Sequence, residues 1–160
     1  MVDAESGAAA TRKELLESIP RWRQQLSDLP EFSTHGVGVA TTAARLVERL
    51  LILAIAGLLP EARLPARPTL GHRVGAIEQY GRKHPMVCLG RPRGLVARTE
   101  ITVLNRLTNG RNALAHLQDD EDFAMTMGRL RPSDVVEMLE IAEAVALLPL
   151  FDELLGRESA

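Results

Sequence analysis

A short polar stretch late in the chain holds residue types that suit chemistry on phosphates. Arg111, Asn112 and His116 fall within six residues, in the segment Arg-Asn-Ala-Leu-Ala-His. A histidine can exchange a proton near neutral pH, and the planar fork of donors on an arginine can hold a developing negative charge on oxygen. These three side chains are therefore the candidate catalytic residues of the sequence.

The positions of these residues on a helix decide which of them can act together. At about 100° per residue, Asn112 and His116 share one face of a helix expected over about 95–117. An apolar stripe on another face consists of Val103, Leu107, Gly110, Leu114 and Leu117. Arg111 lies between the two faces, and its side chain is long enough to swing toward His116. We expect the polar face to line a cleft, a subunit interface or solvent.

The segment 111–116 resembles the signature of the HEPN superfamily (higher eukaryotes and prokaryotes nucleotide-binding domains). In that signature an Arg, usually followed by a polar residue, precedes a His late in a helical bundle. The order of the other elements is similar too: a long helix, a helix opened by Thr69-Leu70-Gly71, a basic loop, the motif helix and a closing helix. The resemblance covers roughly residues 33–155 in outline and is specific over 111–116.

The resemblance implies an activity. Many HEPN proteins are dimers whose two motifs meet in a shared cleft and cut RNA without a metal ion. The 2′-hydroxyl attacks the adjacent phosphate and leaves a 2′,3′-cyclic phosphate end. Carried over to this chain, His116 would move the proton, Arg111 would stabilise the crowded phosphate, and Asn112 would orient one of them or the substrate. We therefore expect a homodimeric, metal-independent endoribonuclease of the toxin or defence type.

A second interpretation stays open, because other HEPN proteins keep the fold without activity. The mannitol-operon-repressor-like branch has a similar Arg-Asn…Ala-His motif, so the alternative is a non-catalytic module that binds a partner protein or nucleic acid. In the toxin branch paired with a nucleotidyltransferase antitoxin, a modifiable Tyr follows the His by two residues. Here that position is Gln118, which argues against that pairing, although another antitoxin or regulatory protein is still a candidate partner.

Each motif residue also has a purely structural explanation. His116 can satisfy the last carbonyls of its helix and the helix dipole. Arg111 and Asn112 can close a buried hydrogen-bond network at a dimer interface. Together with the family pattern, the catalytic interpretation is supported as well as these structural ones.

Charge is distributed unevenly along the chain, although the net charge is only −2. Residues 63–111 hold nine Arg and one Lys against Glu78 and Glu100, a formal charge of +8, so the remainder carries −10. The basic residues between those two glutamates are the candidate nucleic-acid contacts: Arg82, Lys83, Arg91, Arg93 and Arg98. Such a segment can attract a phosphate backbone, or it can dock on an acidic part of the chain or of a partner.

The run Asp119-Asp120-Glu121-Asp122 begins three residues after His116. We expect it to cap the next helix and solvate a turn rather than to bind a metal. Carboxylates so close to the motif would repel RNA unless arginines offset them, and Glu100 in the motif helix adds to that objection. No pair of histidines has a metal-ligand spacing, and the single Cys88 excludes a CxxC zinc site. Neither a metal nor a cofactor is expected.

The composition favours packed helices. Hydrophobic residues make up 46% of the 160 residues and aromatic residues only 3%, which disfavours a β-sandwich or barrel. Apolar residues recur at spacings of three and four, most clearly over about 35–59, where the expected core face is Val39, Ala43, Leu46, Val47, Leu50, Leu51, Ala54 and Leu58. Thr69 is expected to cap a short helix that ends at Gly81. The predicted fold is an all-α, HEPN-like, up-and-down bundle of four to five helices, dimeric because the motif helix is apolar on two faces.

One helical domain is expected over 11–160, after a flexible tail over 1–10. Pro20 should bend or restart the first helix, and Pro149 should kink the last. The uncharged stretch 50–59 is too short for a bilayer span, which needs about 20 apolar residues. The acidic, polar N-terminus does not resemble a signal peptide. These features predict a cytoplasmic protein that does not bind a membrane.

Overall fold

The computed structural model describes residues 7–27, 34–89, 98–116 and 132–158. Within its helices, the side chains at 34, 35, 37, 98, 99, 110–116, 132 and 158 are not described. Every regular element in these ranges is a helix, so the all-α class is confirmed. The helices are α1 (Ala8–Ser27), α2 (Thr34–Leu58), α3 (Leu70–Lys83), α4 (Arg98–His116), α6 (Pro132–Ala146) and α7 (Pro149–Glu158).

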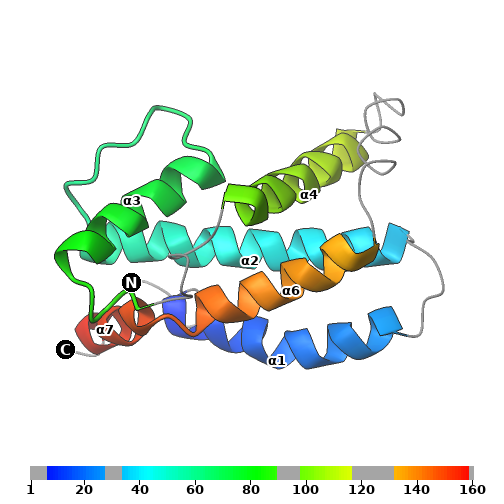
Figure 1. Cartoon of the computed structure of the whole chain (residues 1–160), viewed down its shortest axis with the longest axis horizontal. Helices are drawn as coiled ribbons and strands as arrows, with labels where there is room; N and C mark the ends of the chain where they lie inside the picture. The colour runs from blue at the N-terminus through cyan, green and yellow to red at the C-terminus, as the bar shows by residue number, and fades with distance from the viewer. Residues whose placement is uncertain (1–6, 28–33, 90–97, 117–131, 159–160) are drawn as a thin grey trace.

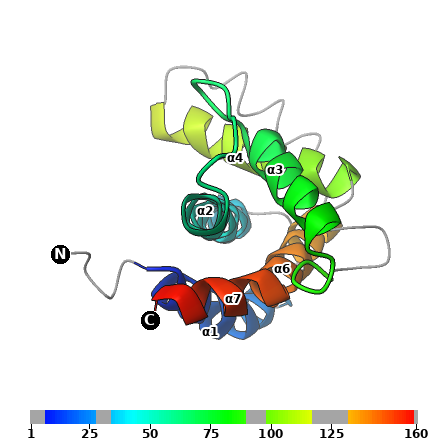
Figure 2. The same ribbon diagram turned by 90° about the vertical axis from the view of Figure 1, so that its left-hand side faces the viewer.

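Helix α2 lies at the centre of the molecule and contacts each of the other five helices. Helices α3 and α4 cover one side of it, and α1, α6 and α7 cover the other (Figure 2). All eight residues of the expected core face of α2 are buried, because the helical period keeps them on one stripe along the whole helix. No helix in the described ranges combines the length and the apolarity needed to cross a membrane.

The bundle has alternating long helices and two shorter additions. Helices α1, α2, α4 and α6 alternate in direction along the long axis, whereas α3 runs parallel to α2 and α7 extends from the end of α6 (Figure 1). The described residues thus contain six helices rather than four or five. The extra helix arises because Pro149, which has no N–H to continue α6, occupies the first position of a new helix. Phe151, fully buried, then fixes α7 to the core.

Helix α1 begins earlier than the sequence analysis placed it. Residues 8–10, expected in the N-terminal tail, form its first turn. Ala8 is only 1% exposed, and the Thr11 hydroxyl donates a hydrogen bond to the Gly7 carbonyl at 3.0 Å. Pro20 lies on the exposed side of this helix, which continues through it to Ser27.

Helix α3 begins as expected and ends later. Thr69 is its N-cap, but the helix continues through Gly81 to Lys83, with His84 as the C-cap. A Cβ added at Gly81 would lie 2.8 Å from the Cβ of Cys88. Glycine is therefore needed at position 81 because the turn after α3 packs against the helix, and not because the helix stops there.

Candidate functional site

The three candidate catalytic residues lie together in the last two turns of α4. Arg111, Asn112 and His116 are helical in backbone, as the sequence predicted, and their side chains lie outside the described residues. The acidic run 119–122 also lies outside them. What the structure establishes is how the preceding turns hold this segment.

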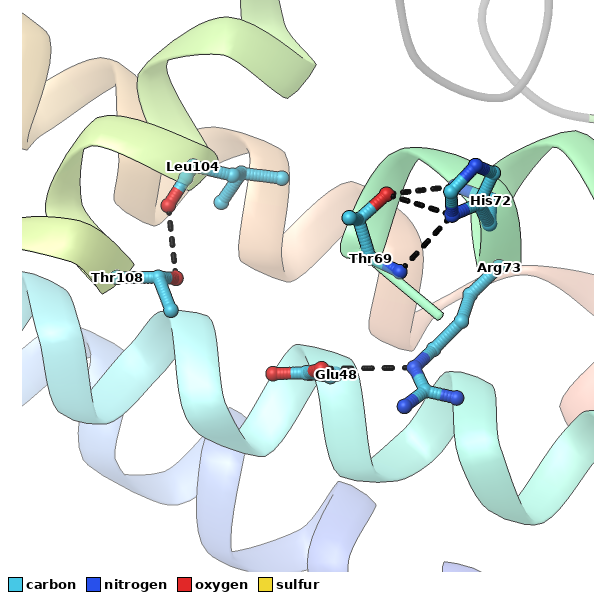
Figure 3. A network of polar contacts seen from close by, with 6 residues as sticks. All are labelled: Glu48, Thr69, His72, Arg73, Leu104 and Thr108. Carbon is cyan, nitrogen blue, oxygen red and sulfur yellow. Dashed lines mark hydrogen bonds and ion pairs between the residues drawn. The ribbon is translucent and has the colours of Figure 1, made fainter. Parts of the chain in front are cut away.

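The N-terminal half of α4 is anchored in the core. Leu104 and Leu107 are fully buried, and the Thr108 hydroxyl donates to the Leu104 carbonyl at 2.9 Å (Figure 3). Val103, which the expected stripe included, is only half-buried, so the buried face is rotated toward Leu104.

Glu100 does not place a carboxylate near the motif. It lies in the first turn of α4 and is 8% exposed. At 1.5 Å per residue, position 116 is about 24 Å further along the helix. A carboxylate in the first turn also interacts favourably with the helix dipole. The objection that Glu100 would repel RNA at the motif therefore loses its basis.

The basic residues that the structure describes are not near the motif. A Cβ added at Gly71 would lie 3.8 Å from Cγ2 of Ile101, so α3 and α4 meet at their first turns, and from there they run apart (Figure 1). Arg82 and Lys83, both exposed, lie in the last turn of α3. Their helix and α4 are about 20 Å and 28 Å long, so Arg82 and Lys83 lie at the opposite end of the molecule from His116.

The side chains of the other three basic candidates lie outside the described residues. Arg91 and Arg93 lie outside the described residues, and Arg98 is the first residue of α4, with its side chain not described.

Two ends of the molecule can now be distinguished. The motif end is the last two turns of α4, residues 110–116. The cleft end comprises the loop 59–69, the last turns of α3, and α7.

The cleft end holds a cavity of about 940 Å³ that the sequence analysis did not anticipate. It lies between the loop after α2 and one face of α3, and Arg157 of α7 also lines it. Its ionisable lining residues are Glu61, Arg63, His72, Tyr80, Lys83, His84 and Arg157. A signal was present in the sequence, since the small residues Gly71, Gly75 and Ala76 share one helical face that is flanked by cationic residues.

Hydrogen bonds hold α3 against α7 beside this cavity. The Tyr80 hydroxyl donates to Oε2 of Glu153 at 3.1 Å, and Arg157 donates to Oε1 of the same carboxylate at 2.9 Å. Burial, followed by the bond to Glu153, raises the pKa of Tyr80. The phenol therefore stays protonated and positioned on α7 at neutral pH.

His72 is part of the N-cap of α3 rather than a free base. The Thr69 backbone N–H donates to Nδ1 of His72 at 3.0 Å, while the Thr69 hydroxyl accepts from the His72 backbone N–H at 3.3 Å (Figure 3). Nδ1 is thus an acceptor, which leaves the ring proton of the neutral imidazole on Nε2. The next residue, Arg73, reaches α2 and donates to Glu48 at 3.4 Å.

Other reactive groups in the described residues form no second site. No group of three or more His, Cys, Asp and Glu side chains among them could hold a metal ion. Cys88 is a free, half-buried thiol, and burial, followed by the charge of Glu153, raises its pKa. A thiol with a raised pKa is a poor nucleophile at neutral pH.

No family model matches the chain, and no curated protein or solved structure matches it either. The assignment of a function therefore depends on the motif, on the geometry that holds it and on the charges around it.

Proposed function

We propose that the chain is a metal-independent endoribonuclease of the HEPN type that leaves 2′,3′-cyclic phosphate ends, with Arg111 and His116 carrying the chemistry. The observation that supports this function is that the whole motif falls in one helix whose preceding turns are buried. Leu104 and Leu107 fix the axis and rotation of α4. Groups on a rigid helix are held more precisely than groups on a loop. The transfer of protons to and from the oxygens of the reacting phosphate diester requires such precise placement.

The reaction needs one proton acceptor and one proton donor. The 2′-oxygen forms a bond to phosphorus as its proton passes to the imidazole of His116. The P–O5′ bond breaks, and the leaving oxygen takes up a proton. Arg111 balances the negative charge that builds up on the phosphate oxygens, and Asn112 orients the substrate or one of the other two groups. No electrons are transferred, and no metal is required.

The geometry of this displacement favours a homodimer. Attack and departure occur on opposite sides of phosphorus, so the base and the acid must flank the phosphate. The motif of one chain has a single histidine, His116. A second copy brings the same motif to the other side, which lets one imidazole accept the proton while the other donates it.

The cleavage assay is made in EDTA, with an unstructured RNA and the purified full chain. The wild type should release products that end in a cyclic phosphate, identified by mass spectrometry. His116→Ala and Arg111→Ala should each lower the rate by about 100-fold or more, while circular dichroism shows the wild-type helix content. Arg106→Ala is the matched control, because Arg106 is an exposed arginine on the same helix, ahead of the motif.

One observation favours the non-catalytic alternative. Arg82 and Lys83 lie far from the motif end of the same chain, so one copy does not join them and Arg111 into a single short track for RNA. If RNA stays intact with the wild type in all conditions, the nuclease is excluded and a regulatory module that binds a partner is the better description. Cleavage that persists in His116→Ala would equally exclude the proposed mechanism.

A further inference from the structure

All the asparagines of the chain lie on one helix. The sequence contains three, Asn105, Asn109 and Asn112, and they fall within eight residues of α4, directly before and inside the motif. Asparagine is unfavourable in the interior of a helix, because its amide competes for backbone hydrogen bonds. A residue type that is absent from the rest of the chain and unfavourable where it occurs therefore needs a reason at this place.

The spacing of the asparagines is that of one helical face. Steps of four and three residues separate them, and a further step of four in the sequence reaches His116. Residues three or four apart are neighbours on the surface of a helix. We call the face of α4 at positions 105 and 109, whose side chains the structure describes, the amide face.

The amide face becomes exposed where α3 leaves α4. Ile101, one turn ahead of Asn105, is half-buried, and a Cβ added at Gly71 of α3 would lie 3.8 Å from its Cγ2. From that contact α3 and α4 run apart (Figure 1). Asn105 is half-buried and Asn109 is exposed, so the exposure of the face rises toward the motif.

The amides of Asn105 and Asn109 are not used within the described fold. Neither side chain forms a hydrogen bond with a residue that the structure describes. Thr108, which lies between them in the sequence, differs, because its hydroxyl donates to the Leu104 carbonyl at 2.9 Å. Each amide can therefore offer an external ligand one oxygen acceptor and two N–H donors.

The surroundings of the amide face favour a polar ligand over a protein surface. The exposed side chains of α4 that the structure describes are Thr102, Arg106 and Asn109, all of them polar. A protein interface has an apolar centre inside a polar rim, and this stretch of α4 offers no such centre. Single-stranded RNA, in contrast, presents unpaired bases whose edges carry hydrogen-bond donors and acceptors.

We propose that the amide face recognises a base of the RNA next to the bond that the motif cuts, with Asn109 in contact with that base and Asn105 with the base beyond it. The inference rests on the proposed nuclease function and adds a sequence preference to it. An asparagine amide pairs with adenine by accepting from N6 and donating to N7, so adenine is the base expected at Asn109. Position 116 is only about 10 Å further along the helix, which keeps the contacted base close to the cleaved bond.

Competitive cleavage by the full chain measures the preference. In EDTA, a mixture of unstructured RNAs with randomised bases around the cut is digested, and sequencing gives the relative kcat/KM for each base at each position. The wild type should favour adenine at one position by about tenfold, the effect of one bidentate contact. Asn109→Ala should remove this preference, and its better helix propensity should preserve the fold. Arg106→Ala is the matched control and should keep the preference.

Two further variants sharpen the assignment. Asn109→Asp replaces the amide with a carboxylate, which accepts from N4 of cytosine and cannot donate to adenine N7. The preference should therefore move from adenine to cytosine. Asn105→Ala should weaken the preference at the neighbouring position and leave the adenine preference at the Asn109 position in place.

A binding measurement separates this inference from the nuclease function. Fluorescence anisotropy compares labelled oligo(A), oligo(C) and oligo(U) on His116→Ala, with and without Asn109→Ala. Oligo(A) should bind about tenfold more tightly than the other two, and the second substitution should make the three affinities equal. This result needs no cleavage, so it tests the amide face even if the wild type leaves RNA intact. An adenine preference that persists in Asn109→Ala, or no binding of any of the three, would refute the base contact. Dissociation of a wild-type dimer by Asn109→Ala in sedimentation velocity would assign the amide to the interface between copies instead.

Discussion

The motif end and the cleft end differ in how they are held. At the cleft end, charged and hydrogen-bonded side chains connect the elements: Tyr80 and Arg157 meet on Glu153, and Arg12 of α1 pairs with Asp152 of α7 at 2.8 Å. Ahead of the motif end, α4 is fixed by the apolar Leu104 and Leu107. Directional polar contacts thus add to the buried core at the cleft end, while buried leucines anchor the turns ahead of the motif end.

This difference separates the candidate catalytic motif from the cavity. The motif lies on α4, whereas the cavity and the exposed cations Arg63 and Lys83 that line it lie beside α3. Helix α2 joins the two, since it contacts both α4 and α7. A change at either end should therefore affect the stability of the whole domain while affecting only the chemistry of its own end.

The largest effects on stability should come from truncating buried apolar residues at both ends. Leu107→Ala should cost about 3 kcal/mol and Phe151→Ala about 4 kcal/mol, because each leaves a cavity at a fully buried position. Both side chains belong to one core cluster, so each variant should unfold in a single transition in urea, followed by circular dichroism. Two separate transitions would show that the ends are independent units.

A smaller effect should come from the close approach of α2 and α7. A Cβ added at Gly57 would overlap Cδ1 of Leu154, which is 2% exposed. Gly57→Ala should therefore destabilise the domain by about 2 kcal/mol, despite its better helix propensity. Gly156→Ala is the matched control, because a Cβ there meets nothing within 4 Å, and it should stabilise α7 by up to about 1 kcal/mol. Equal midpoints of thermal unfolding for the two variants would contradict this packing.

The hydrogen bond of Tyr80 adds a pH dependence to the stability of the cleft end. Tyr80→Phe should cost about 1.5 kcal/mol at pH 7 by removing the bond to Glu153. The folded state raises the pKa of Tyr80, so its contribution is complete below the unfolded value of about 10 and is lost as the pH rises through the folded value. The stability of the wild type should thus fall toward that of Tyr80→Phe above pH 10. A constant difference between the two proteins over this range would rule out the assigned ionisation.

Local patterns in the sequence predicted the local structure well. The core face of α2 follows from a period of 3.6 residues sustained over 25 residues, and the cap at Thr69 follows from the preference of the N-cap for a side-chain oxygen. The prediction that α3 ends at Gly81 was wrong. A glycine is needed there because it contacts Cys88, seven residues later in the chain. Sequence spacing does not reveal such a contact.

The functional regions likewise include one part that the local sequence predicted and one part that it did not. Placing the motif in a helix needed only the sequence around Arg111 and His116. Finding the cleft required the positions of the loop 59–69 against α3 and of Arg157 at the far end of the chain. The segmental charge of +8 over 63–111 likewise did not show that α3 and α4 run apart from a shared start and carry their ends to opposite sides.

The smallest effect concerns the first turn of α3, which lies between the two ends and next to α4. Thr69→Ala should lose about 1 kcal/mol, since it removes the hydroxyl that accepts from the His72 backbone N–H. Thr42→Ala is the control, because the Thr42 hydroxyl only donates back to the Gly38 carbonyl within α2, at 2.8 Å, a bond that does not favour the helix. Both are read from urea unfolding. RNA cleavage at the motif end should stay at the rate of the wild type in Thr69→Ala. Loss of cleavage would instead show that the start of α3 is coupled to the motif end through the contact between Gly71 and Ile101.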